Sequence, residues 1–336
     1  MKKMKKSFTF ILVLCVLLSL LVVPGLAAPR NLRLSHSAFE GHPTWASCET
    51  LKKEIEARTN GAITVEIYPS SMLGNTTDVV EQIKLGVVDM GIYTNGQLSA
   101  YDSSFGILNF PYFFDDHRHV FACLDGKPGD MLKAKALEAG FKVLYFWDNG
   151  FRQVTNSVRP LNSPADFVGL RLRVPPEITL ETAMRTLGAT PTTIAFTELY
   201  MAMLQGVCDG QENPLATIYN DKFYEAQKYV AMMNYSYHTN HILFNPGVWN
   251  SFSPEIQKAI MEAGEVATKF NRQLVMDNEK QYIEDLIKNG MEFSYPDPAV
   301  MRETLMPARQ ELSKTVNAAW YEEFAAAVEG VRQSLK

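Results

Sequence analysis

The sequence lacks most of the features that mark an enzyme. Only four of its 336 residues are cysteines, and their spacing suits neither a disulfide framework nor a metal cluster, so we predict buried free thiols with at most one disulfide pair. It contains no GxSxG, HExxH, Walker or Gly-rich dinucleotide motif. Because catalytic residues can also come together from distant positions, this lack weakens the case for an enzyme without excluding one.

Basic residues are also scarce relative to acidic ones. The chain has 32 lysines and arginines against 37 aspartates and glutamates, a formal net charge of −5, and four of the lysines lie within the first six residues. No basic patch is present, which argues against a nucleic-acid-binding protein. An anionic ligand would have to be attracted by local arginines and not by the overall field.

Long hydrophobic runs are absent except at the N-terminus. The four lysines precede an almost wholly apolar stretch at 11–23, which small residues follow up to Ala27. This order is typical of a secretory signal peptide over residues 1–27, and the run is shorter than the roughly 20 residues of a membrane-spanning helix. An uncleaved anchor is the alternative. A lipid anchor on Cys15 is disfavoured because Leu14 is too large for that motif.

The rest of the chain alternates strand and helix patterns, which predicts an α/β fold. We expect strands at about 32–34, 63–67, 88–93, 143–147, 152–156, 170–174, 207–212 and 242–244, with helices at 43–59, 75–86, 176–187 and 197–205. Apolar positions at helical spacing then continue from the Ser253-Pro254 start to Gly290, about 54 Å at 1.5 Å per residue. A helix of this length either bridges two domains or projects into solvent. The C-terminal region should be helical with a break near Pro307.

Arginine gives the clearest sign of a binding site. Leu170, Leu172 and Val174 define the core side of one strand, so Arg171 and Arg173 share its other side. Arg152 lies in another strand-like stretch. The planar guanidinium donates two parallel hydrogen bonds and therefore suits a carboxylate. From the pattern alone, such an arginine either binds an anion or simply faces solvent or an acidic residue.

Two other polar regions leave alternatives open. Residues 206–214, GVCDGQENP, are either a plain polar turn or a group of orienting side chains at the edge of a cleft. His117 and His119 fit a solvated turn better than a metal site, and His238 and His241 point to opposite faces of a strand. We therefore predict neither a metal nor a cofactor.

These segments together resemble one family, the extracytoplasmic solute receptors of tripartite ATP-independent periplasmic (TRAP) transporters. The resemblance follows the order of the chain and includes NGFR at 149–152, GLRLRVP at 169–175 and DGQENP at 209–214. Further matching segments are 58–61, 68–74, 110–114, 159–160, 195–200 and 239–241.

The resemblance implies a periplasmic-binding-protein-like fold, with two α/β lobes around a ligand cleft and a long helix spanning both. We expect residues 28–149 and about 239–275 to form the first lobe, and residues 150–238 and about 276–336 to form the second. It further implies a monomer in the periplasm that binds a small carboxylate and hands it to the membrane subunits of a TRAP transporter.

The resemblance also assigns roles to individual residues. Arg173 would grip the ligand carboxylate, Arg152 would support it, Asn213 would donate a hydrogen bond and Phe196 would pack on the ligand body. The other wall of the cleft would come from strand ends of the first lobe. The remaining candidates for the cleft are Ser37, Tyr93, Thr94, Asn95, Trp147 and Gln211.

The ligand class remains open among C4-dicarboxylates, sugar acids, keto acids and aromatic acids. Sialic-acid receptors of the family use charged groups near the positions of Thr94 and Gln97, where this chain is neutral, and this argues against a sialate. A secreted enzyme acting on a carboxylate and a receptor that serves a signalling partner are the alternatives to a transport protein.

Overall fold

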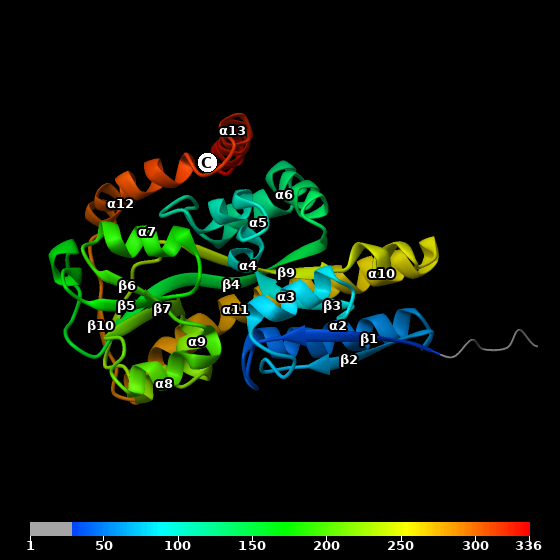
Figure 1. The fold of residues 1–336 in the computed structure, drawn as a ribbon, viewed down its shortest axis with the longest axis horizontal. Coiled ribbons are helices and arrows are strands. Elements are labelled where there is room, and N and C mark those ends of the chain that lie inside the picture. The colour runs from blue at the N-terminus through cyan, green and yellow to red at the C-terminus, as the bar shows by residue number, and fades with distance from the viewer. Residues whose placement is uncertain (1–28) are drawn as a thin grey trace, which may run out of the picture.

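The computed structural model of the protein describes residues 29–336, so the predicted signal peptide at 1–27 lies outside the described residues. Figure 1 shows an elongated molecule with strands running through its middle and helices on both sides. The strands are β1 (Arg30–His36), β2 (Ile63–Tyr68), β3 (Met90–Thr94), β4 (Lys142–Asn156), β5 (Arg171–Val174), β6 (Thr190–Thr193), β7 (Gly210–Pro214), β8 (Tyr229–Ala231), β9 (Tyr237–Phe244) and β10 (Glu292–Ser294).

The helices of the described part alternate with these strands, as predicted. They are α2 (Pro43–Arg58), α3 (Thr76–Lys84), α4 (Asn95–Ser99), α5 (His117–Leu124), α6 (Lys127–Glu138), α7 (Ile178–Thr186), α8 (Leu199–Leu204), α9 (Leu215–Asn220), α10 (Pro246–Asn250), α11 (Pro254–Lys288), α12 (Pro298–Ser313) and α13 (Ala318–Ser334). Short 3-10 helices lie at Ser103–Asn109, Pro164–Phe167, Phe196–Glu198 and Phe223–Glu225.

The first lobe is built on parallel strands. β1 pairs in parallel with β2 on one side and with β3 on the other, and β9 joins antiparallel to β3. The alternating residues Leu32 and Leu34 of β1 are fully buried, and they share a core with Leu51 and Ile55 of α2. The predicted period-2 strands and the 3.6-residue helical face therefore meet in one core.

β4 connects the two lobes. Its residues up to Phe151 pair with β9, whereas Arg152 to Asn156 pair with β7 of the second lobe. The register with β9 shifts between Asp148 and Gly150, and Gly150 has φ +108°, a conformation that favours glycine. The sequence predicted two separate strands here. The structure shows one continuous strand with a β-bulge, which bends a strand without ending it.

The second lobe has its own strands and core. β7 lies between β4 and β5, β5 pairs in parallel with β6, and β8 pairs with both β4 and β10. Leu172 and Val174 of β5 are fully buried, and the same core includes Leu180 of α7 and Leu305 of α12. This confirms the core side that was predicted for the Arg171–Val174 strand.

The 35-residue helix α11 runs along both lobes, which confirms the predicted fold class. It contacts α2, β4 and α9. Within it, Thr268 accepts a hydrogen bond from Trp147 (Nε1 to Oγ1, 3.0 Å), and the Asn271 side chain accepts one from the backbone of Asp148 (2.7 Å). The helix is therefore fixed to β4 close to the bulge.

The C-terminal region differs from the prediction in two respects. α12 continues through Pro307 without a break, and the chain instead leaves the helix before Asn317, which caps α13. Pro307 and Glu303, the residue whose carbonyl loses its partner, both lie on the exposed face, where water can replace the missing bond. α13 then packs on α5 and α6 of the first lobe (Figure 1), although the predicted division placed all of 276–336 in the second lobe.

The histidines at 117 and 119 do not lie in a solvated turn. They form the first residues of α5, where Asp116 caps the helix and His119 is almost fully buried. His117 Nδ1 lies 2.8 Å from the buried carboxylate of Asp148, and despite the opposing effect of burial this neighbour raises the pKa of His117.

Cys48, Cys123 and Cys208 are buried free thiols, as predicted.

Candidate functional site

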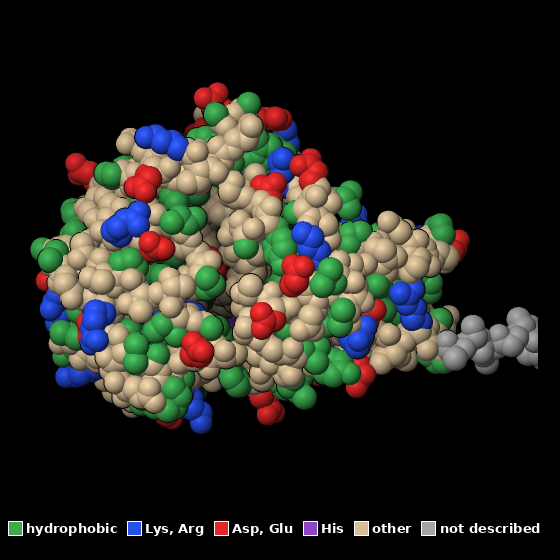
Figure 2. All heavy atoms as spheres, in the orientation of Figure 1, with side chains coloured by type: hydrophobic (Ala, Val, Ile, Leu, Met, Phe, Trp, Pro, Cys, Tyr) green, Lys and Arg blue, Asp and Glu red, His purple; other side chains and the backbone are tan. Residues whose placement is uncertain are grey.

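A cleft lies between the two lobes, with a volume of about 840 Å³ that includes the part open to solvent. Figure 2 shows a narrow hollow at this place in the middle of the molecule. The first lobe lines the cleft through the ends of β1 and β3 and the start of α2, whereas the second lobe contributes the ends of β5 and β7 and one face of α9. Ligands of α/β sheets commonly bind at such strand ends.

Arg152 forms the floor of the cleft. Its guanidinium pairs with both carboxylate oxygens of Glu212 on the neighbouring strand β7, and Nη1 lies 2.7 Å from His238 Nδ1. Nη2 also donates to the side-chain oxygen of Asn213 at 3.3 Å. Burial disfavours the charged guanidinium, but Glu212 outweighs this effect and raises the pKa of Arg152. The floor is thus a buried ion pair that is already satisfied within the protein.

Arg173 forms the wall of the cleft and is bonded differently. Its Nε and Nη2 both donate to the carbonyl of Ile194, at 2.9 and 2.7 Å, and within the described residues Nη1 makes no hydrogen bond. The side chain is 1% exposed, and burial lowers the pKa of Arg173 to about 10, which still leaves it charged at neutral pH. This guanidinium has no carboxylate within ion-pair distance among the described residues.

Arg171 provides an internal contrast on the same strand. It lies two residues before Arg173 and therefore on the same side of β5, as predicted. It is exposed at the outer end of the strand, where it pairs with Asp209 (Nη2 to Oδ1, 2.5 Å). The same residue type on one strand side thus has two environments, because only the inner position is covered by the 194–196 segment.

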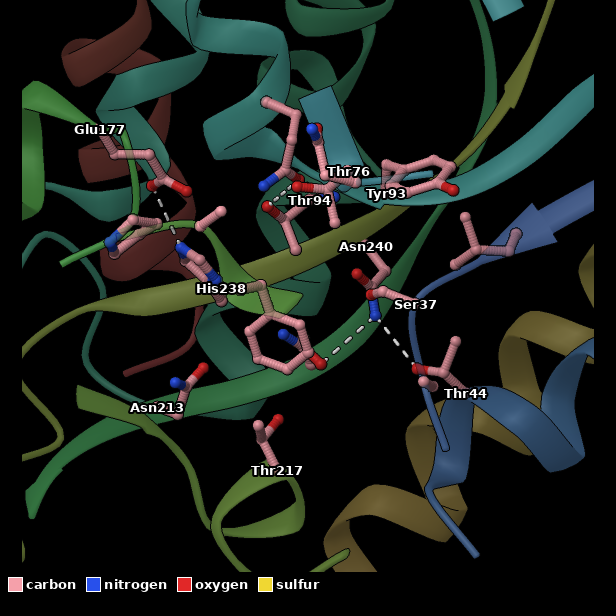
Figure 3. Close-up of a pocket in the computed structure, with 18 of the residues that line it drawn as sticks. Ser37, Thr44, Thr76, Tyr93, Thr94, Glu177, Asn213, Thr217, His238 and Asn240 are labelled. Carbon is pink, nitrogen blue, oxygen red and sulfur yellow. Dashed lines mark hydrogen bonds and ion pairs between the residues drawn. The ribbon is translucent and has the colours of Figure 1, made fainter. Parts of the chain in front are cut away.

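Glu177 and His238 connect the two lobes at the charged end of the cleft (Figure 3). Glu177 accepts a hydrogen bond from Asn109 of the first lobe at 2.7 Å and lies 3.4 Å from His238 Nε2. Burial and the nearby Arg152 lower the pKa of His238, so the ring is neutral at physiological pH. Burial opposes the charge of Glu177, but His238 and the two arginines hold the pKa of this carboxyl below its usual value.

Gly96 of α4 adds a second contact between the lobes at Glu177. A Cβ atom at Gly96 would lie 1.7 to 2.2 Å from the Glu177 carboxyl atoms, closer than side-chain atoms can approach. Only glycine therefore allows this approach.

The other end of the cleft is lined mainly by neutral hydrogen-bonding groups (Figure 3). Asn240 donates to Thr44 and Asn149, at 3.1 and 3.3 Å, and Thr217 lies 3.4 Å from His42 Nε2 across the cleft. Burial lowers the pKa of His42 to about 3, so this ring is neutral as well. The described lining residues include no lysine.

Seven of the ten predicted site residues line this one cleft. They are Ser37, Tyr93, Thr94, Arg152, Arg173, Phe196 and Asn213. Their direct role in ligand binding remains a prediction, but the structure brings them together from both lobes.

The other three predicted site residues lie behind the cleft wall. Trp147 is fully buried in the first-lobe core and is held there by its bond to Thr268. Asn95 bonds to Asn109 and Phe105, and Gln211 bonds to Thr155 while accepting from Asn213. Because their polar groups are satisfied by other residues, these three side chains support the lining and do not form it.

Sequence reasoning missed several lining residues. Glu177, Thr217 and Asp221 face the cleft from α9 and the start of α7, and His238 and Asn240 face it from β9. The period-2 pattern of β9 carried a usable signal, since 238 and 240 share one strand side. No comparable signal marks Asp221, the C-cap residue of α9.

Within residues 29–336 no group of three or more histidines, cysteines or carboxylates is placed to hold a metal ion. In the same range, no helix combines the length and the apolar character that a membrane crossing requires. The arrangement of the cleft instead suits an anion, held by a buried guanidinium between two lobes that meet around it. These features define a two-lobed solute-binding protein.

Comparison with known proteins identifies the family. Residues 34–315 match DctP, the bacterial extracellular solute-binding protein family 7. The C4-dicarboxylate-binding periplasmic protein DctP of Rhodobacter capsulatus is 30% identical over 305 residues, which cover 89% of this chain and 91% of that protein. The chain therefore belongs to the extracellular solute-binding protein family 7.

Two solved structures share the fold. A TRAP periplasmic solute-binding protein from Bordetella bronchispeptica, with density interpreted as pantoate, is 30% identical with a TM-score of 0.84, covering 88% of this chain and 98% of that one. One from Polaromonas sp. JS666, bound to D-erythronate, is 29% identical with a TM-score of 0.85 and the same coverage. This protein is thus a solute-binding protein of the TRAP type.

Proposed function

We propose that this chain captures a small organic carboxylate outside the cytoplasmic membrane and delivers it to the membrane subunits of a TRAP transporter. The observation that carries the proposal is the state of Arg173. This guanidinium is buried and charged, no acidic side chain of the described residues contacts it directly, and it faces a cleft that both lobes line. A buried charge of this kind is costly unless a counter-charge joins it.

Binding would proceed through closure of the lobes. The ligand carboxylate docks on Arg173 while the lobes are apart, and Arg152 keeps the floor rigid through its pair with Glu212. Closure then brings Glu177 against Asn109 and Gly96 and expels water from the cleft. Loss of water strengthens the charge-assisted bonds, and a ligand that contacts both lobes favours the closed state.

The relatives support this assignment. The ligands of the relatives described above, a C4-dicarboxylate, pantoate and D-erythronate, all carry a carboxylate group. For this chain we also propose that the mature protein is a periplasmic monomer, and that its signal peptide is cleaved after Ala27 during secretion. N-terminal sequencing of the exported protein should begin at Ala28.

A matched pair of arginine variants tests the role of the cleft. Arg173→Lys keeps the charge but loses the planar fork, and we expect a loss of about 2–5 kcal/mol in binding free energy. Arg171→Lys makes the same chemical change on the same strand side, at an exposed position outside the cleft, and should bind normally. A thermal-shift screen over organic acids would identify the ligand, and calorimetry would then compare the three proteins.

Either of two results would contradict the proposal. One is that no organic acid stabilises the wild-type protein, since a ligand at 100 times its dissociation constant adds about 2.7 kcal/mol. The other is that Arg173→Lys binds as tightly as Arg171→Lys. We also propose that the ligand is bound without turnover, so it should be recovered chemically unchanged after prolonged incubation. Appearance of a product would instead favour a secreted enzyme.

A further inference from the structure

A second cavity lies on the other side of the strand that connects the two lobes. It has a volume of about 310 Å³, including its part open to solvent, and it is lined by Gly150 and Phe151 of β4 and by Asn149 at the bulge, which borders both cavities. Arg152, the next residue of β4, forms the floor of the ligand cleft, and adjacent residues of a strand point to opposite faces. We therefore call this second cavity the back pocket.

The neighbouring strand and helix show the same division. On β9, His238 lines the cleft, whereas Tyr237 packs its ring on Phe151 on the opposite face, with ring centroids 5.2 Å apart. On α9, Thr217 lines the cleft and Ala216 lines the back pocket. β4, β9 and α9 thus separate the back pocket from the cleft.

The walls of the back pocket belong to different lobes. His117 comes from α5 of the first lobe, where its Nδ1 lies 2.8 Å from the carboxylate of Asp148. Leu215 and Ala216 come from α9 of the second lobe, and both pack in the core of that lobe. A change in the angle between the lobes must therefore change the distance between these walls.

The long helix α11 lines the back pocket with one of its faces. Val275, Glu279 and Tyr282 are four and three residues apart, so they lie on the same side of the helix. Just before them, Arg272 donates to Asp125 of the first lobe (Nη1 to Oδ2, 2.6 Å), whereas Tyr282 packs in the core of the second lobe. This part of α11 and the bulge of β4 therefore form the hinge between the lobes.

Opening of the cleft would narrow the back pocket. In this structure the lobes meet across the cleft, where Glu177 of the second lobe bonds to Asn109 of the first. Separating them there rotates one lobe about the hinge, and groups on the opposite side of a hinge then approach each other. Ala216 would move towards His117, and the volume of the back pocket gives room for this motion.

We propose that the back pocket limits how far the lobes can separate, so that a larger side chain in it holds the lobes closer together and strengthens ligand binding without touching the ligand. The inference rests on the proposed closure of the lobes. Val275 is the position that tests it, because this buried residue lines the back pocket and is not among the described residues that line the cleft. A ligand that binds the closed form gains affinity in proportion to the fraction of protein already closed.

Two substitutions at Val275 change the pocket in opposite directions. Val275→Met adds a longer, flexible side chain, whereas Val275→Ala enlarges the pocket. Calorimetry with pantoate, D-erythronate and L-galactonate, the ligands of three similar proteins, should show at least threefold tighter binding by Val275→Met and at least threefold weaker binding by Val275→Ala. The factor should be the same for every acid that binds the wild type, because the change acts on the lobes and not on a ligand contact.

The separation of the lobes can be measured in the ligand-free protein. Met72 of the first lobe precedes the lining residues 75–77, Met201 of the second lobe follows the lining residue Phe196, and both methionines are exposed. Spin labels on cysteines at these two positions would report the distance across the cleft, since the native cysteines of the described part are buried. Double electron–electron resonance should show a shorter mean distance in Val275→Met than in the wild type.

Val266→Met is the matched control, because it makes the same substitution at an exposed position of the same helix, outside the back pocket. Its affinities and label distances should equal those of the wild type. Melting temperatures would show whether each variant is folded, and Val275→Ala decides the question if Val275→Met does not fold. Unchanged affinity in the Val275 variants, an unchanged label distance in Val275→Met, or a factor that differs from acid to acid would overturn the inference.

These outcomes differ from a failure of the proposed function itself. If carboxylate binding is wrong, no acid binds the wild type, while the label distance still responds to Val275→Met. If only the inference is wrong, acids bind the wild type and Arg173→Lys weakens them, but Val275→Met behaves like Val266→Met.

Discussion

The floor and the wall of the cleft each contain a buried arginine, but the two arginines are bonded in opposite ways. Arg152 in the floor is saturated by Glu212, His238 and Asn213. Within residues 29–336, the sole hydrogen-bond partner of Arg173 in the wall is the carbonyl oxygen of Ile194, and one of its Nη groups makes no hydrogen bond. The floor is therefore a structural ion pair, whereas the wall keeps a charge available for a ligand. Burial and residue type alone do not distinguish the two roles, but the list of hydrogen-bond partners does.

The largest expected effect is a difference in unfolding free energy between a variant of the floor and a variant of the wall. Glu212→Gln leaves the buried Arg152 charge without its partner, and loss of one member of a buried pair typically costs about 3–5 kcal/mol. Urea unfolding of the ligand-free protein would measure this loss. Arg173→Gln should lower the unfolding free energy far less than Glu212→Gln, because the charge that it removes has no acidic partner among the described residues and is itself costly to bury. Similar unfolding free energies for the two variants would remove the distinction.

A second prediction concerns the contact between Gly96 of the first lobe and Glu177 of the second lobe, which we propose forms when the cleft closes. Gly96→Ala places a Cβ atom within 1.7 to 2.2 Å of the Glu177 carboxyl atoms, so Glu177 must leave Asn109 and His238. We expect ligand affinity to fall about tenfold or more, which corresponds to about 1.4 kcal/mol, and calorimetry would measure it.

Gly330→Ala is the control for that variant. Gly330 lies in α13, where an added Cβ would meet nothing within 4 Å. Its affinity should be unchanged, and its stability should rise by up to about 1 kcal/mol because alanine favours helix. Unaltered affinity in both glycine variants would mean that the Glu177 contact does not take part in closure.

A third prediction concerns Trp147, which lies behind the cleft wall and should affect stability without affecting ligand affinity. Trp147→Phe removes the hydrogen bond to Thr268 and should lower the unfolding free energy by about 1 kcal/mol. Ligand affinity should stay the same, because the side chain does not line the cleft. If affinity falls while stability is preserved, the original prediction of Trp147 as a cleft residue would be correct.

The smallest effect is expected at Arg171. Its pair with Asp209 is on the surface, with the arginine side chain 49% exposed, and such pairs contribute about 0.2–1 kcal/mol at most. Arg171→Gln should therefore leave both affinity and stability nearly unchanged when measured as above. A large loss in either would show that the outer end of β5 matters for the site.

The sequence was informative where a short local pattern determines the structure. Alternation of Leu172 and Val174 with arginine identified the strand and the side on which Arg173 lies, and the Ser253-Pro254 start identified the long helix. The pattern could not separate Arg171 from Arg173, because what covers one of them is the 194–196 segment more than twenty residues later.

Predictions from local sequence patterns were wrong or incomplete where the environment of a residue depends on segments far away in the sequence. An aromatic residue such as Trp147 fits a core and a cleft equally well, and only the neighbouring Thr268 of α11 shows which applies. Asp221 and Glu177 line the cleft from the ends of two short helices, and no local sequence pattern marks these positions. Pro307 predicted a helix break that did not occur, since exposure of that helix face lets water take the place of the lost bond.

The position of α13 has a consequence for how the chain is made. Phe324 and Val328 of this last helix are buried in the same core as Phe113 and Leu132 of the first lobe. That core cannot be completed until α13 has been synthesised, so a nascent polypeptide without α13 lacks part of its native packing. An incompletely folded polypeptide is also the form that could pass through a narrow export channel, as the secretion proposed above would require.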